Sequence, residues 1–152
     1  MSTVPDSTAS LLQRAVGLHQ QGRFDDAAAL YRQVLERDPR QVDALHLSGV
    51  MAKQRGDAGA AVALIERALA IDPRHAGAHA NLGAALSALG ETGKARRSYE
   101  QAIALDPGYA LAHSNRGNAL RSLGRLDEAL ASYERALQLQ PAAVDAASGR
   151  AI

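Results

Sequence analysis

The chain has 152 residues, of which 47% are hydrophobic and 3% aromatic, and its formal net charge is +1. Such a near balance of charge gives no field that would favour nucleic acid or an anionic membrane surface as a partner. The absence of Cys excludes a disulfide scaffold, a thiolate nucleophile, an iron–sulfur cluster and a Cys-ligated zinc site.

The chain opens with a short polar lead, residues 1–7, which lacks the basic and apolar regions of a secretory signal. The longest apolar run, Ala60 to Ile65, is far shorter than the ~20 residues that span a bilayer. An Ala-rich, aromatic-poor composition favours helix. We therefore expect an all-α, cytoplasmic protein that does not bind membranes.

Four columns of residues recur every 34 positions without a gap. The columns are Pro39, Pro73, Pro107 and Pro141; Gly22, Gly56, Gly90 and Gly124; Ala27, Ala61, Ala95 and Ala129; and Gly49, Gly83 and Gly117. A fixed period of this length is typical of a repeat architecture. It predicts four repeats, at residues 8–41, 42–75, 76–109 and 110–143.

Each repeat is predicted to form two helices, which in the first repeat cover residues 8–21 and 25–38. Gly22 and its equivalents stand just past the first helix, where a left-handed residue is needed. The Asp38-Pro39 step ends the second helix, since proline cannot continue it. Asp25 and Asp127 are predicted to cap the second helices of the outer repeats. Glycine, at Gly59 and Gly93, replaces them in the middle repeats and should cap less firmly.

Small and large residues alternate in a way that predicts how the two helices pack. Glycine in mid-helix costs about 1 kcal/mol relative to alanine, so Gly49, Gly83 and Gly117 indicate a close approach of a neighbouring backbone. We expect the Ala27 column to be the opposing surface. Large residues fill the space between hairpins: Leu18, Leu86 and Leu120; Tyr31, Ile65, Tyr99 and Tyr133; and Leu35, Leu69, Ile103 and Leu137.

These columns together resemble the tetratricopeptide repeat (TPR), over about nine-tenths of the chain. The third repeat shows the pattern best, with Leu82-Gly83, Leu86, Gly90, Ala95, Tyr99, Ala102 and Asp106-Pro107. The leucine of the Leu-Gly pair is replaced by Arg14, Ser48 and Arg116 in the other repeats. An arginine there can lay its aliphatic stem on the core edge and keep its charged head in water.

The resemblance implies a right-handed superhelical solenoid of antiparallel helix–turn–helix repeats. Its concave groove would be lined mainly by the first helices. Stacked hairpins leave one long surface, and such surfaces usually bind segments of other proteins. We therefore predict a non-catalytic protein–protein interaction scaffold that binds a peptide segment of a partner protein in the groove.

The candidate groove residues are the polar ones on the first helices: Gln13, His46, Lys53, Asn81, Ser87, Asn115, Asn118 and Arg121. A side-chain amide both donates and accepts, so it can hold a peptide backbone of any sequence. Asn81 and Asn115 repeat at the unit period, which resembles the asparagine ladder of O-linked N-acetylglucosamine transferases. Alternatively, they are solvated polar positions of the repeat. The groove of the first two repeats is more apolar, with Val16, Leu47 and Val50.

One column of the first helices argues against a known mode of peptide binding. The column that would supply the first lysine of a chaperone-type carboxylate clamp holds Leu12, His46, Ala80 and Ser114. A carboxylate needs convergent cations to offset its desolvation. We expect no such clamp.

No pattern of a catalytic or metal site is found. His75 and His79 are four residues apart, as two metal ligands on a helix would be, but no third ligand is evident. No P-loop, HExxH, GxSxG or GxGxxG motif is present. We predict no metal, no cofactor and no enzymatic activity.

Residues 144–152 resemble the start of a fifth repeat or a partial cap, because Val144-Asp145-Ala146 matches Val42-Asp43-Ala44. A repeat array normally ends in a capping helix with a polar outer face. Two alternatives follow. The chain could be the substrate-recruiting repeat segment of an O-linked N-acetylglucosamine transferase-like glycosyltransferase. It could also be a self-assembling protein, a homo-oligomer formed through the uncapped C-terminal end.

Overall fold

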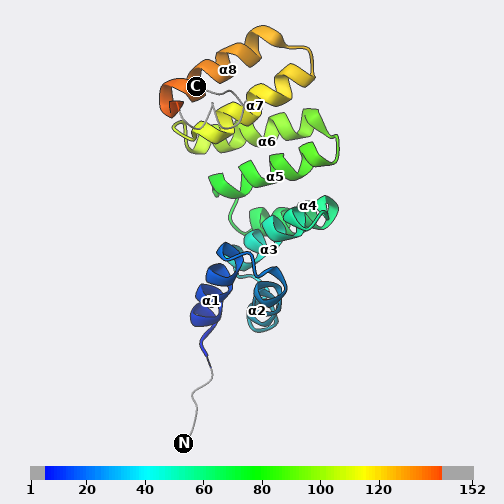
Figure 1. Ribbon diagram of the computed structural model, residues 1–152, viewed down its shortest axis with the longest axis vertical. Helices are drawn as coiled ribbons and strands as arrows, with labels where there is room; N and C mark the ends of the chain where they lie inside the picture. The colour runs from blue at the N-terminus through cyan, green and yellow to red at the C-terminus, as the bar shows by residue number, and fades with distance from the viewer. Residues whose placement is uncertain (1–5, 142–152) are drawn as a thin grey trace, which may run out of the picture. The chain divides into compact units, whose positions relative to one another are not determined.

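The computed structural model describes residues 6–141, and every element of regular structure in that range is an α-helix. The eight helices are α1 (Thr8–Gln20), α2 (Phe24–Arg37), α3 (Val42–Gln54), α4 (Ala58–Ile71), α5 (Ala76–Ala88), α6 (Thr92–Leu105), α7 (Ala110–Ser122) and α8 (Leu126–Leu139). Consecutive helices lie side by side as four hairpins, α1/α2 to α7/α8 (Figure 1). The predicted all-α helical repeat is confirmed. The proposed incomplete fifth repeat lies outside the described residues.

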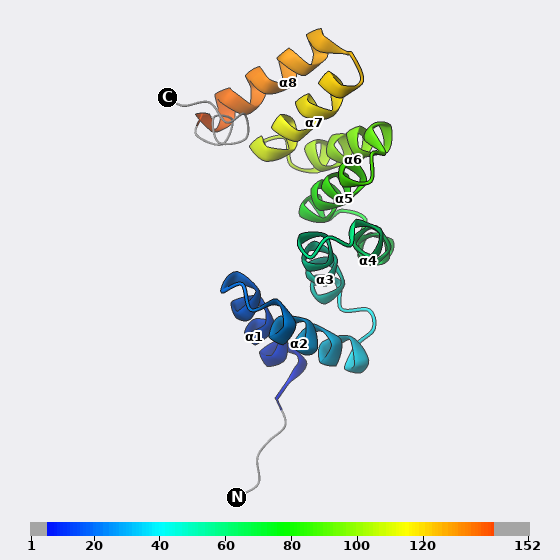
Figure 2. The ribbon, with the colours of Figure 1, turned by 45° about the vertical axis from the view of Figure 1, so that its right-hand side comes forward.

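The helices group into two compact units, one ending at Pro73 and the other beginning at Arg74. In the first unit, α1, α2 and α3 share a core around Leu11, Tyr31 and Val34. In the second unit, α6 packs on α7, and Ala80, Ala102 and Ala112 form an alanine-rich cluster. Figure 2 shows the hairpins of each unit from a second side.

Each hairpin turns at a left-handed glycine, as the sequence predicts. The φ angles of Gly22, Gly56, Gly90 and Gly124 lie between +76° and +90°. In the first turn, the Arg23 N–H donates to the Leu18 carbonyl at 2.9 Å and the Gly22 N–H to the His19 carbonyl at 3.0 Å. This is the Schellman arrangement, which satisfies the last carbonyls of the helix.

The N-terminal capping of the second helices differs from the prediction. The N-cap positions are Arg23 in α2 and Arg125 in α8, and neither side chain caps its helix. Asp25 and Asp127 lie two residues further on, inside the first turn. The side-chain cap occurs in a middle repeat instead, where Asp57 Oδ1 accepts from the Ala60 N–H at 3.0 Å. The prediction was therefore wrong, because it placed the N-cap of each of these helices two residues too late.

The mid-helix glycines are covered by large side chains rather than by the alanine column. A Cβ atom at Gly83 would lie 2.5 Å from Tyr99 Cε1, and one at Gly117 would lie 2.8 Å from the same atom of Tyr133. At Gly49 the nearest atom is Ile65 Cγ1, at 2.6 Å; the alanine column contributes only the Ala61 carbonyl, at 3.1 Å. The glycines make room for a ring or a branched side chain on the partner helix.

Candidate functional site

The predicted groove positions recur on the first helix of each hairpin. All of them except His46 follow one stripe at three-residue steps, for example Asn115, Asn118 and Arg121 on α7, because residues three apart lie on the same face of a helix. Exposed side chains in this set are Gln13, Ser87 and Arg121; Lys53, Asn81, Asn115 and Asn118 are half-buried. These positions are thus accessible to a ligand, each within its own unit.

His46 does not share this exposure. It is only 8% exposed, and the equivalent residues Ala80 and Ser114 are buried as well. These residues directly precede a stripe position, so they are turned by about 100° around the helix axis, into the packing between helices. His46 is therefore a packing residue, and the column to which it belongs does not line an open groove.

In the first unit, the stripe positions border a depression of about 450 Å³. Its lining includes Val16 and Leu47, which were predicted, and Phe24, Tyr31 and Gln54, which were not. The sequence signal for the last three was weak, because Phe24 and Tyr31 belong to the second helix and Gln54 lies at the end of α3. The depression combines apolar rings with amide groups, as sites for peptide side chains do.

His19 lines that depression, and both of its ring nitrogens have hydrogen-bond partners. Its Nδ1 lies 3.1 Å from the Tyr31 hydroxyl and its Nε2 2.7 Å from Gln54 Oε1. The ring also meets Phe24 edge-on, with centroids 5.7 Å apart. Burial raises the pKa of Tyr31 to about 12. The result is a preorganised polar centre between α1, α2 and α3.

In the second unit, the stripe on α7 carries amide groups. The Asn118 side-chain oxygen accepts a hydrogen bond from the Tyr133 hydroxyl, which fixes its orientation. Within residues 6–141, no side chain or backbone group hydrogen-bonds to the Asn115 amide. One amide is therefore oriented by the fold, and the amide one turn away keeps its donors and acceptor for a ligand.

Arg116 behaves differently from the expectation that its charged head stays in water. Its side chain is 24% exposed. The Nε donates to Glu100 Oε2 at 2.9 Å and Nη1 to the Ser132 Oγ at 2.6 Å. Glu100 also pairs with Arg96 Nη1 at 2.5 Å. Arg116 therefore joins α6, α7 and α8 through an ion-pair network, which the sequence did not reveal because Glu100 belongs to the preceding repeat.

Of the two histidines that resembled metal ligands, His75 and His79, the first has a structural role in helix capping. His75 Nδ1 accepts from the Ala78 N–H at 2.9 Å and so caps α5. His113 Nε2 lies 2.9 Å from the Pro107 carbonyl. Among residues 6–141, no three His, Asp or Glu side chains gather in a way that could hold a metal ion. In the same range, no helix is both long and apolar enough to cross a membrane.

The hairpins, their glycine turns and the stripes on their first helices define a helical-repeat protein, a class whose members commonly bind other proteins. The sequence matches profiles of the tetratricopeptide repeat over residues 12–76, 64–97 and 110–142, and a TPR repeat profile over 85–120. The chain belongs to the tetratricopeptide repeat family, as the sequence columns predicted. No curated protein sequence matches it.

Solved structures of similar proteins have the same fold. The crystal structure of MamA is 27% identical, with a TM-score of 0.78 over 89% of this chain and 82% of that one. TTC0263, a thermophilic TPR protein of Thermus thermophilus, is 26% identical, with a TM-score of 0.80 over 95% and 84% of the two chains. MamA 41-end from Desulfovibrio magneticus RS-1 is 20% identical, has a TM-score of 0.80 over 90% and 77%, and shows the fold alone. The chain is thus a protein-interaction scaffold in general terms.

Proposed function

We propose that this chain is a non-catalytic scaffold that binds a peptide segment of a partner protein along the exposed stripes of its first helices. The observation that carries the proposal is the α7 stripe, where Asn115 has no partner within residues 6–141 and Asn118 is oriented by Tyr133. Free amides of this kind can pair with the backbone of an extended peptide. The family likeness supports the same kind of activity.

Each unit, taken by itself, offers a ligand different chemistry. The depression between α1, α2 and α3 is bordered by Val16, Leu47 and Phe24 and suits an apolar side chain. The second unit offers the amide of Asn115 and the exposed cation of Arg121.

A photo-crosslinking amino acid placed at Asn115 would test the proposal in the intact chain. We expect it to capture a discrete partner peptide, which mass spectrometry of the adduct would identify. The matched control carries the same crosslinker at Arg135, an exposed position on α8 away from the stripe. Asn115→Ala together with Arg121→Ala should weaken binding of the captured peptide, with the helical circular dichroism unchanged. Capture of the same adduct from both positions, or no loss in the double variant, would contradict the proposal.

A further inference from the structure

The network around Arg116 shows how one repeat interface is filled. The side chain of Arg116 extends from α7 into the space between α6 and α8, where it reaches both Glu100 and Ser132. The first unit contains the same interface two repeat periods earlier. There Ser48 stands in place of Arg116, Arg32 in place of Glu100, and Leu64 in place of Ser132.

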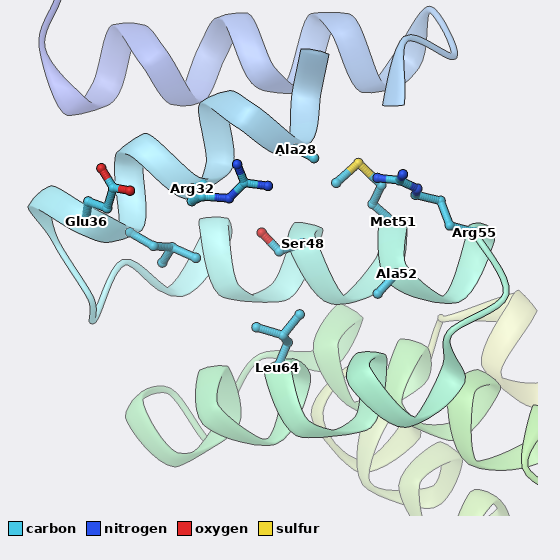
Figure 3. Close-up of a pocket in the computed structure, with 9 residues that line it drawn as sticks. Ala28, Arg32, Glu36, Ser48, Met51, Ala52, Arg55 and Leu64 are labelled. Atoms are coloured by element: carbon cyan, nitrogen blue, oxygen red, sulfur yellow. The ribbon is translucent and has the colours of Figure 1, made fainter. Parts of the chain in front are cut away.

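These replacements leave the interface of the first unit open. Ser48 is too short to cross the space that Arg116 fills, and a cleft of about 410 Å³ lies between α2, α3 and α4. Its walls are mainly apolar and include Leu35, Met51 and Leu64. Figure 3 shows Ser48 between α2 above it and Leu64 below it. The volume lies within the range of about 300–1,000 Å³ that is common for ligand sites.

The sign of the charge at this cleft is opposite to that at the equivalent position of the second unit. Arg32 occupies the position at which the other interface has the carboxylate of Glu100, and no carboxylate of residues 6–141 pairs with it. The guanidinium of Arg32 lies over Ser48, while the carboxylate of Glu36 is at the far end and points away (Figure 3). The second cation, Arg55, is already paired with Asp25 at 2.8 Å. One unpaired cation therefore stands beside an apolar floor.

We propose that this cleft is a second docking site, separate from the first-helix stripes, and that it takes an acidic side chain next to a leucine-like side chain of a partner protein. The carboxylate would pair with Arg32, and the apolar side chain would pack on Met51 and Leu64. In the second unit, Arg116 and Glu100 form this kind of charge contact within the chain. In the first unit, the carboxylate of the partner would provide it. A partner with a Leu-Glu or Leu-Asp step has the complementary chemistry.

The two methionines of the chain, Met1 and Met51, provide a direct probe of the cleft. In the full chain labelled with ¹³C-methyl methionine, the Met51 signal is assigned by its loss in Met51→Leu. The probe ligands are acetylated, amidated pentapeptides of sequence Ala-Ala-Leu-Glu-Ala and, as control, Ala-Ala-Leu-Lys-Ala. We expect a saturable shift of the Met51 signal with the first peptide and binding weaker by about tenfold with the second, because it loses the charge-assisted contact.

Paired variants separate the charge contact from the shape of the cleft. Arg32→Glu together with Ser48→Arg recreates the ion pair of Glu100 and Arg116 and fills the space, so we expect it to fold and to lose peptide binding. The control Arg135→Glu makes the same reversal of charge on α8 and should bind as the parent does. Asn115→Ala, which alters the α7 stripe and not the cleft, should bind the Leu-Glu peptide as the parent does. The test of the cleft is therefore independent of the test of the proposed function.

Three outcomes would overturn the proposal. One is equal binding of the Leu-Glu and Leu-Lys peptides, and another is unchanged binding by the filled double variant. The third comes from hexanoate, a small carboxylate with an apolar tail. A Met51 shift with hexanoate but none with the Leu-Glu peptide would assign the cleft to small amphiphiles rather than to a partner protein.

Discussion

Steric demand at single residues explains why glycine persists inside three helices of this chain. At Gly83, a methyl group would meet the ring of Tyr99, which is itself 3% exposed and therefore has little space into which it could move. Gly17 also lies inside a helix, α1, but a methyl group there would meet no atom within 4 Å. Two glycines inside α-helices thus respond in opposite ways to an added methyl group.

Gly83→Ala is expected to destabilise the protein by about 1–3 kcal/mol, since overpacking exceeds the gain in helix propensity. Gly17→Ala should instead stabilise it by about 0.5–1 kcal/mol, because only the propensity term changes. Urea unfolding followed by circular dichroism measures both. A stabilised Gly83→Ala variant would mean that the ring of Tyr99 can move away at little cost.

The buried tyrosines predict a loss of stability at high pH. Burial raises the pKa of Tyr31 and of Tyr99 to about 12. The folded state therefore keeps protons that the unfolded state releases above about pH 10. Each tyrosine makes its full contribution to the free energy of unfolding below about pH 10. Between about pH 10 and 12 that contribution should decrease, by about 2 kcal/mol for each tyrosine. Unfolding of Tyr99→Phe over this range should show a shallower decrease, and an equal slope would contradict the burial argument.

At the scale of helices, the second helices of the hairpins differ in whether a side chain caps their N-terminus. Only one of the four second helices in residues 6–141, α4, has a side-chain N-cap, provided by Asp57. The others begin after Arg23, Glu91 or Arg125 without one. An acidic residue two positions later, such as Asp127, interacts favourably with the helix dipole but satisfies no N–H group by capping.

Asp57→Ala should therefore cost about 1 kcal/mol of stability. Asp127→Ala, which removes an acidic residue from the first turn of α8, should cost about 0.3–1 kcal/mol at low salt and less at high salt. The loss at Asp57 should depend less on salt, because part of it is the hydrogen bond to the Ala60 N–H rather than the charge at the helix end. Thermal unfolding at low and high salt provides the measurement, and equal salt sensitivity would contradict the assignment of the cap.

The ion pairs of the chain also differ in how much they stabilise it. Arg116→Ala removes a half-buried guanidinium that joins three helices and should cost about 2–4 kcal/mol, because Glu100 and Ser132 then lose a partner. Arg125→Ala removes an exposed pair with Glu128 that water screens, so we expect a much smaller loss of stability than for Arg116→Ala. A double-mutant cycle between positions 116 and 100 should show coupling, and additive effects would refute the network.

At the scale of the whole molecule, the sequence predicted the features that depend on period and on backbone chemistry. The 34-residue columns predicted the hairpins, and glycine and proline fixed where helices end, because left-handed turns and missing N–H groups act locally. The caps at Asp25 and Asp127 were misplaced because adding two residues to the start of a helix does not alter the spacing of its apolar residues. The apolar pattern therefore does not locate the N-cap.

The candidate site was less predictable than the fold. The stripe positions Asn115 and Arg121 follow from helical periodicity, and they are accessible. The burial of His46 and the open cleft beside Ser48 were not predicted, because both depend on what the neighbouring hairpin brings to the position. The sequence of a single repeat does not show which residues of the next hairpin pack against it.

Hydrogen exchange should reveal the two units separately. Each hairpin contacts only its neighbours, so stability in such chains is a sum of local terms. Arg116→Ala should reduce amide protection in α6, α7 and α8 within the second unit, whereas α1 and α2 keep theirs. Peptide-level exchange read by mass spectrometry provides the comparison. A uniform loss of protection across all eight helices would indicate one cooperative unit.

The column of large residues opposite the mid-helix glycines has a spectroscopic consequence. Ile65, Tyr99 and Tyr133 cover glycines in three hairpins, and Tyr31 holds the equivalent position in the first hairpin. The chain has no Trp that would quench tyrosine emission by energy transfer. Phenylalanine substituted at all but one of the tyrosines would leave a single emitter in a chosen hairpin. The protein thus carries its own set of position-specific optical reporters, and the second hairpin can be added to it by Ile65→Tyr.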